Sequence, residues 1–337
     1  MFKINQYFMK IFNNKEELSI RYDKEHAAVW CYFNPKKRSC FSMTMLKEIF
    51  ETQNAIIDYF KKYDMNPPYP IRYFVLASQI PETFNFGGDL DLFVSLIRSK
   101  NREKLFEYAK LCVDTVYLNA TGMNLPVTTI AFVEGAALGG GFESALSSNV
   151  LIATENARLG FPEIRFNLFP GMGAYSLLAR YAGVKTAEEM ITSGKIYTAK
   201  ELYERGIITE IASSGYKTVE KYMKRHSKVF NGMQAISKAK KRYESLDYEE
   251  LLDITKIWVD AALKLTDQDI KTMMKFVSAQ EQKNISEAKR IRTKQDRRID
   301  IEKVTFPLID SNGNIVMRDR RKTKDRRKGE IYQKAAS

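Results

Sequence analysis

Apolar and polar positions along this 337-residue chain follow two periods, one typical of strands and one typical of helices. Residues 17–33 alternate well enough to predict a hairpin of two strands. Residues 43–64 and 102–118 carry apolar side chains at helical spacing and predict two amphipathic helices. Buried strands are predicted for three further apolar segments: 71–78, 126–135 and 149–154.

The connections between these elements predict the fold class. Residues 79–89 are expected to form a loop that leads into a helix, and residues 139–148 a short helix between two strands. Alternation of strands with helices predicts an α/β protein with mostly parallel strands. Residues 1–210 are therefore assigned to an α/β core.

The pattern changes after Gly206, where a last strand at 207–213 is followed by helices. Residues 251–265 have a strong apolar face, and Thr266 to Asp269 fit a capping box that opens the next helix. Residues 211–292 are interpreted as a helical subdomain for packing or oligomer contacts.

Residues 293–337 form a basic tail that repeats Asp-Arg-Arg at Asp296, Asp319 and Asp325. Asn312-Gly313 lies between two short apolar runs, which predicts a hairpin. The tail is interpreted as solvated and partly disordered, with an electrostatic contact to nucleic acid or anionic lipid as the alternative. Because aromatic residues do not interleave with its basic ones, nucleic acid is the less favoured partner.

Composition narrows the class of protein. The formal net charge is +13, and 17 Lys/Arg against 9 Asp/Glu from Glu281 onward contribute +8 of it. Such a charge suits an acidic carrier protein or a phosphate-bearing coenzyme as partner, or serves solubility alone. Neither a signal peptide nor a membrane span is expected, and three cysteines without CxxC spacing favour a reduced, cytoplasmic compartment.

Histidine is scarce, and this limits the possible chemistry. His26 and His226 have no metal-ligand neighbours at useful spacing, so neither a metal site nor a histidine-dependent nucleophile is favoured. Acid–base chemistry would then rest on carboxylates.

The glycine run Gly139–Gly141 follows a predicted strand, as phosphate-binding loops do. No Lys follows it, which excludes a P-loop, and Ser144 with a very short helix argues against a dinucleotide site. Exposed main-chain N–H groups at such a turn can instead stabilise a carbonyl oxygen as an oxyanion hole. The glycine-containing loop at 84–93 is the candidate for the second donor.

Two glutamates lie close to this glycine run in sequence. Glu143 falls on the first turn of the expected helix, and Glu163 falls in an apolar loop with Phe161, Ile164 and Phe169. A carboxyl group among apolar side chains should have a raised pKa. Such a pair can move a proton from the carbon next to a carbonyl and deliver one to a leaving hydroxyl. Each glutamate taken alone would more often be a capping or solvated acid.

Three ordered motifs, "FNFGGDL", "VEGAALGGGFESAL" and "FPEIRFNLFPGMGA", resemble those of the crotonase (enoyl-CoA hydratase/isomerase) superfamily over roughly residues 15–280. The resemblance implies a spiral of ββα repeats with a C-terminal helical subdomain for oligomerisation. It further implies that Gly88 and Gly140 supply the two oxyanion-hole N–H groups and that Glu143 and Glu163 are the catalytic pair. Phe142, Leu168 and Met172 are the expected pocket residues. The resemblance implies no metal and no cofactor.

Within that superfamily the chain is most similar to the diffusible signal factor synthases. These enzymes dehydrate 3-hydroxyacyl chains on acyl carrier protein to cis-2-enoyl thioesters and hydrolyse them to a fatty acid used in quorum sensing. The resemblance implies three partners: acyl carrier protein, further copies of the chain in a trimer or dimer of trimers, and a sensor kinase as regulator. The alternatives are an enoyl-CoA hydratase/isomerase acting on CoA thioesters, and a non-catalytic binding protein, against which both glutamates argue. The tail after residue 293 has no counterpart in the family pattern.

Overall fold

The computed structural model describes residues 6–13, 15–62, 69–213 and 215–278, together with two short strands at 308–309 and 315–316. Residues Met1–Asn284 form one compact unit and Ile285–Ser337 a second. The described parts of each unit are treated separately.

Two sheets organise the first unit. The larger has the strand order β1 (Leu18–Asp23), β2 (Ala28–Phe33), β3 (Tyr73–Ser78), β5 (Thr128–Val133), β7 (Val150–Thr154) and β10 (Glu210–Ala212). β1 and β2 pair as an antiparallel hairpin, and every other pairing in this sheet is parallel. The smaller sheet has the order β4 (Thr83–Asn85), β6 (Ala136–Leu138), β8 (Arg158–Gly160) and β9 (Ile196–Thr198), with β8 and β9 antiparallel.

Helices precede, connect and follow these strands. They are α1 (Gln6–Lys10), α2 (Met43–Lys62), α3 (Leu90–Arg98), α4 (Arg102–Ala120), α5 (Gly140–Leu146), α6 (Ala174–Ala182), α7 (Val184–Ser193), α8 (Ala199–Glu204), α9 (Tyr216–Ser227), α10 (Phe230–Tyr243) and α11 (Tyr248–Ala262), with two 3₁₀ turns, η1 (Gly122–Asn124) and η2 (Glu163–Phe166). Residues 267–278 form a further helix. None of the described helices is long and apolar enough to cross a membrane.

A ββα unit recurs along the chain, as the resemblance implied. β3 and β4, β5 and β6, and β7 and β8 are successive strand pairs, and helices follow each pair. The first strand of each pair joins the larger sheet and the second joins the smaller one. The predicted α/β class with mostly parallel strands is confirmed.

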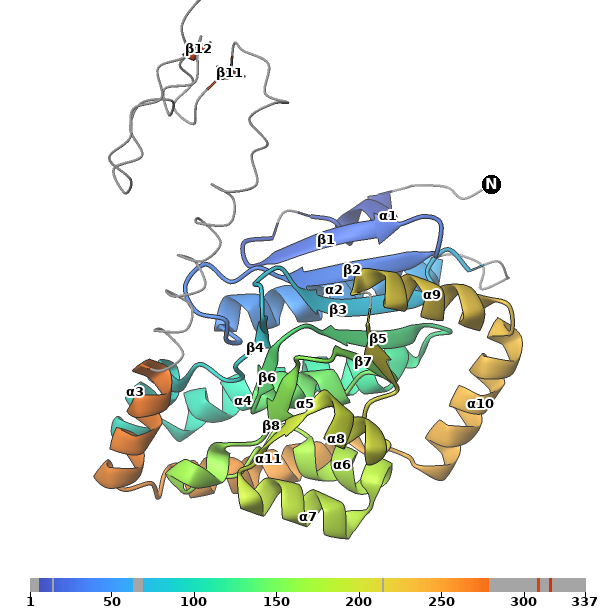
Figure 1. Cartoon of the computed structure of the whole chain (residues 1–337). Helices are drawn as coiled ribbons and strands as arrows, with labels where there is room; N and C mark the ends of the chain where they lie inside the picture. Colours follow the sequence, from blue (N-terminus) through green and yellow to red (C-terminus); the bar gives the residue numbers. More distant parts are fainter. Residues whose placement is uncertain are drawn as a thin grey trace, which may run out of the picture. The chain divides into compact units, whose positions relative to one another are not determined.

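Side chains of the larger sheet point alternately into two apolar layers, as the period of a strand requires. On β3, Tyr73 and Val75 belong to the layer that includes Val219 and Met223 of α9. Phe74 and Leu76 belong to the larger layer, to which α2 and α4 contribute. In Figure 1, α9 lies over one face of these strands and α2 lies behind them. Burial on both faces explains why these strands read as continuous apolar runs.

The expected elements are largely confirmed, with one correction in the segment 79–89. It was expected to be a loop, but residues Thr83–Asn85 form β4, which pairs in parallel with β6. A strand of three residues is too short to show a period. The expected capping box opens the helix at 267–278, because the Thr266 N–H donates to the Asp269 carboxylate at 2.8 Å and the Asp269 N–H donates to the Thr266 hydroxyl at 3.3 Å.

In the second unit β11 (Leu308–Ile309) and β12 (Ile315–Val316) pair in antiparallel fashion, as predicted for the apolar runs on either side of Asn312-Gly313, and the turn between them lies outside the described residues. The predictions for the rest of the tail lie outside the described residues.

Candidate active site

The predicted site residues follow the carboxyl ends of three neighbouring strands. Gly88 comes after β4, Gly140 begins α5 after β6, and Glu163 begins η2 after β8. β4 pairs in parallel with β6, and β6 pairs in parallel with β8. Because parallel strands end at the same edge of a sheet, this edge collects three segments that are far apart in sequence.

Each glycine of the run Gly139–Gly141 meets a different close neighbour. A Cβ at Gly139 would collide with the carboxyl oxygen Oε1 of Glu163, and its φ of +55° also disfavours a side chain. A Cβ at Gly141 would collide with the carbonyl oxygen of Asn85 at the end of β4. A Cβ at Gly140 would lie 3.3 Å from the Cα of Gly87. The run therefore lets three strand ends approach each other.

The N–H groups of Gly88 and Gly140 are available to a ligand. Both residues line the same cavity, and within the described part of the chain neither N–H group donates a hydrogen bond. Both residues are half-buried, so their N–H groups can be reached from the cavity. Two such donors side by side fit the oxygen of a thioester carbonyl, which gains negative charge during reaction.

Glu143 extends from the first turn of α5 and is 1% exposed. Its Oε1 accepts hydrogen bonds from the N–H groups of Met172, at 2.8 Å, and Ala174, at 3.0 Å. Burial raises the pKa of Glu143 to about 7, although these two N–H donors oppose the rise. The donors also fix the carboxyl group in one position.

Glu163 is held differently. Its Oε2 atom is buried and has no hydrogen-bond partner among the described residues. Burial and the nearby charge of Glu143 raise the pKa of the Glu163 carboxyl to about 8. Two carboxyl groups that interact in this way resist ionising together, so the pair holds one proton near neutral pH. One acid and one base are what paired proton transfer requires.

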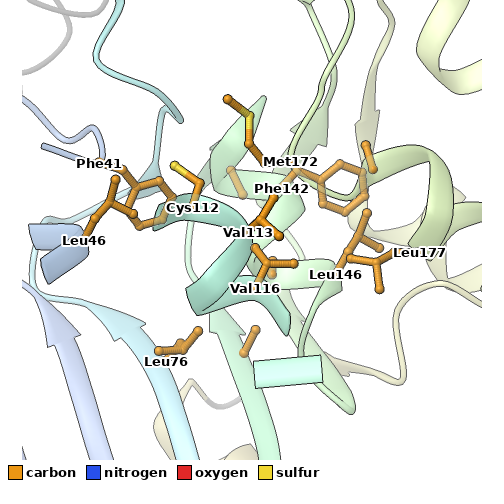
Figure 2. Packing of buried hydrophobic residues seen from close by; sticks show 14 of the residues in the cluster. Phe41, Leu46, Leu76, Cys112, Val113, Val116, Phe142, Leu146, Met172 and Leu177 are labelled. Carbon is orange, nitrogen blue, oxygen red and sulfur yellow. The ribbon is translucent and has the colours of Figure 1, made fainter. Parts of the chain in front are cut away.

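A mostly apolar cavity extends from these groups between α2, α4, α5 and α11. Leu168 and Met172 line it, as expected. Phe142 does not, and the expectation for this residue is wrong. Its ring is fully buried and stacks on Phe161 at 4.9 Å between centroids. Figure 2 shows Phe142 on the side of Leu146 and Leu177, away from the cavity residues Phe41 and Leu46. Phe142 directly precedes Glu143 in a helix, so the two side chains point in different directions.

Three aromatic residues that the sequence did not single out support the site. The ring of Phe93 packs against Gly88, and it contacts Tyr108 and Trp258 edge-on with centroids 5.0 and 5.2 Å apart. The Tyr108 hydroxyl donates to the carbonyl of Phe41 and accepts from the N–H of Asp89. In the sequence, the spacing of these three residues indicates only that they lie on apolar helix faces. Spacing does not show which other segment such a face packs against.

Neither histidine reaches the cavity. His26 lies 2.7 Å from Asp23 in the turn between β1 and β2, and His226 lies on α9, where it is buried against Tyr73 of β3. No group of three or more His, Cys, Asp or Glu residues that could hold a metal occurs in the described ranges. The carboxyl groups of Glu143 and Glu163 are therefore the acid–base groups of this cavity.

Part of the chain is similar in sequence to a known protein. A protein named "Probable enoyl-CoA hydratase" from Bacillus subtilis (strain 168) is 33% identical over 138 residues, which is 41% of this chain and 51% of that protein. The match thus spans about half of the length of that relative.

Two solved structures have the same fold. An enoyl-CoA hydratase from Bacillus halodurans superposes with a TM-score of 0.64 at 21% identity, covering 77% of this chain and 99% of the other. DspI from Pseudomonas aeruginosa gives a TM-score of 0.58 at 18% identity, covering 72% and 93%. At these identities the structures establish the fold alone. The sequence model of the enoyl-CoA hydratase/isomerase family matches residues 34–285, and the chain therefore belongs to this family.

Proposed function

We propose that this enzyme dehydrates a 3-hydroxyacyl thioester on acyl carrier protein to the cis-2-enoyl thioester and then hydrolyses the thioester. The product is a free cis-2-unsaturated fatty acid, a signal of the quorum-sensing type. The observation that carries the proposal is the meeting of two unused N–H groups, of Gly88 and Gly140, with the Glu143–Glu163 pair at the end of an apolar cavity.

The dehydration step uses every part of this arrangement. The thioester oxygen accepts the N–H groups of Gly88 and Gly140, which stabilise the enolate charge that forms when the C2 proton leaves. The ionised member of the carboxyl pair takes that proton. The neutral member donates its proton to the C3 hydroxyl, so that water leaves and the C2–C3 double bond forms. The pair ends with the proton exchanged between its two members, and the atoms balance.

The hydrolysis step needs one more water molecule. A carboxylate of the pair removes a proton from water as the water oxygen attacks the thioester carbon. The same two N–H groups stabilise the tetrahedral oxyanion. When this intermediate collapses, the carbon–sulfur bond breaks, the carrier thiol takes the proton, and the free acid is released.

The choice of carrier rests on the resemblance to diffusible signal factor synthases and on charge. A net charge of +13 favours an acidic carrier protein as partner. The alternative is hydration or isomerisation of CoA thioesters, which the name of the Bacillus subtilis relative favours. The same pair of glutamates would serve both reactions.

Self-association belongs to this proposal as well. α10 has no buried residue in the single chain, and its Ile236 and Tyr243 are 61% and 88% exposed. Apolar side chains gathered on one exposed helix suit a contact with another copy of the chain. A trimer or dimer of trimers would bury them.

The test offers the purified protein a 3-hydroxyacyl carrier protein and, separately, crotonyl-CoA. We expect mass spectrometry to detect a free unsaturated fatty acid released from the carrier. Hydration of crotonyl-CoA without any free acid from the carrier would instead establish the CoA-dependent alternative.

A further inference from the structure

The wall of the acyl cavity becomes polar at one end. On α2, Leu46 and Ile49 line the cavity first, and Gln53 follows one turn later. On α4, Cys112 and Val116 are followed by Asn119. α4 also turns Tyr108 and Thr115 to the cavity, but their hydroxyls donate to the carbonyls of Phe41 and Cys112, so the two amides need an explanation of their own.

Hydrogen bonds show that these polar groups lie at the same end. The Gln53 side-chain NH₂ donates to the carbonyl of Thr115 on α4 at 3.0 Å. The Asn119 NH₂ donates to the hydroxyl of Ser147 on α5 at 2.9 Å. The polar ends of three helices therefore meet in one place.

The amide carbonyls of Gln53 and Asn119 have no hydrogen-bond partner among the described residues, although the two residues are 0% and 1% exposed. Buried acceptors without a donor are costly and uncommon. Both residues line the cavity, so a molecule inside it can supply the missing donors.

The orientation of the Gln53 amide is fixed by its neighbour. The carbonyl of Thr115 can only accept, so the Gln53 NH₂ must face it. The atom of Gln53 that is left without a partner is therefore an acceptor. The Asn119 amide lies 2.9 Å from the hydroxyls of both Ser147 and Ser148, which can donate as well as accept, so it fits there in either orientation.

This polar end lies away from the reacting end. Gly140 and Ser147 are seven residues apart on α5 and the turn after it, which corresponds to roughly 10 Å along a helix axis, and Glu143 lies between them, roughly 6 Å before Ser147. Tyr108, which bonds the loop beside Gly88, lies eleven residues before Asn119 on α4, or roughly 16 Å. A thioester held by Gly88 and Gly140 would thus direct the far part of its acyl chain toward the polar end.

We infer that the preferred acyl chain carries a hydroxyl group at or near its far end, which donates a hydrogen bond to the side-chain carbonyl of Gln53. The inference rests on the proposed acyl-thioester function and narrows the substrate class. A carboxylate would be repelled by this carbonyl oxygen. An ammonium group would lack a counter-charge there, since the polar side chains of this end are neutral amides and hydroxyls.

The test measures equilibrium binding, so the result does not depend on whether the ligand is turned over. Non-hydrolysable amide analogues of the saturated acyl thioester are prepared over a series of chain lengths. At each chain length, one analogue ends in a methyl group and its partner ends in a hydroxymethyl group. Isothermal titration calorimetry measures the affinity of both analogues for the full-length protein. We expect the hydroxyl-bearing analogue to bind about tenfold more tightly at the length that reaches Gln53 and Asn119.

Two other outcomes have separate meanings. Equal or tighter binding of the methyl-terminated analogue at every length overturns the inference and leaves the acyl site standing; water would then occupy the polar end. No binding of either series at any length contradicts the acyl site itself, and the inference with it.

Variants assign the effect to named side chains. Gln53→Met keeps the length of the side chain and removes the acceptor, and we expect the preference for the hydroxyl to fall to about onefold. Asn54→Leu is the matched control, because Asn54 is the next residue on α2, does not line the cavity and bonds only to the carbonyl of Phe50. A preference that survives Gln53→Met would show that Gln53 does not recognise the hydroxyl and would overturn the inference.

Discussion

Gly140 and Gly88 lie so close together that a Cβ added to Gly140 would be 3.4 Å from the backbone nitrogen of Gly88. The two residues belong to successive ββα units and are brought together by the pairing of β4 with β6. Both residues also line the same cavity, as two donors to one carbonyl oxygen must.

Gly140→Ala should disable this pair of donors. The added methyl group would crowd both Gly87 and the N–H of Gly88 and would hinder the approach of a carbonyl oxygen. We expect kcat to fall about 10²-fold, comparable to the loss of one oxyanion-hole donor. Steady-state kinetics on the thioester substrate measure the change.

Gly232→Ala is the control for this substitution. Gly232 lies in α10 with open space around the added methyl group. We expect its activity to be unchanged and its stability to rise by about 0.5–1 kcal/mol, since alanine favours a helix over glycine. Equal activity in both variants would contradict the proposed oxyanion hole.

Glu143→Gln and Glu163→Gln should each abolish proton transfer while the fold is kept. Glutamine is close to glutamate in shape, and its amide oxygen can still accept the N–H groups that bond Glu143. We expect each variant to lose about 10²–10⁴-fold in kcat. Circular dichroism checks the fold, and substantial activity in both variants would refute the mechanism.

The stability of the protein should decrease as pH rises between about pH 4.5 and 8. Folding raises the pKa of Glu143 to about 7 and that of Glu163 to about 8, from the ordinary value of 4.5. In this range the folded protein binds protons that the unfolded chain has released, so the free energy of unfolding falls with increasing pH. Urea unfolding at a series of pH values measures the slope. Glu163→Gln should flatten it, and an unchanged slope would contradict the raised pKa.

Trp258→Ala should cost about 3–5 kcal/mol in the free energy of unfolding. Trp258 is 2% exposed, packs over Gly171 and supports Phe93, which in turn backs Gly88. We therefore expect kcat to fall as well, because Gly88 loses its support. Ile257→Ala is the neighbouring control on α11; Ile257 is 60% exposed, and its loss should change stability by no more than about 0.5 kcal/mol.

Truncation after residue 292 should leave the enzyme active. Every residue assigned here to the site or to its cavity lies before residue 279. We expect the shortened and full-length proteins to have the same kcat/KM and the same melting temperature. Loss of activity at an unchanged melting temperature would assign the tail a direct part in the reaction.

Much of the fold was predictable because its signals are local. The long helices α2 and α4 show their period over many residues, and the buried strands β3 and β5 read as continuous apolar runs. The strand β4 was missed because three residues show no period. Its existence depends on hydrogen bonds to β6, about 50 residues away in sequence.

The sequence by itself determined which residues could carry the chemistry. Glu143, Glu163 and the glycines stand in motifs whose order and composition are visible without coordinates. Only the tertiary structure decided their arrangement: the approach of Gly88 to Gly140, the turning of Phe142 into the core, and the meeting of Gln53 with Asn119 at the end of the cavity. The physical reason is that burial and hydrogen-bond partners depend on contacts between distant segments, whereas residue type and spacing describe each segment alone.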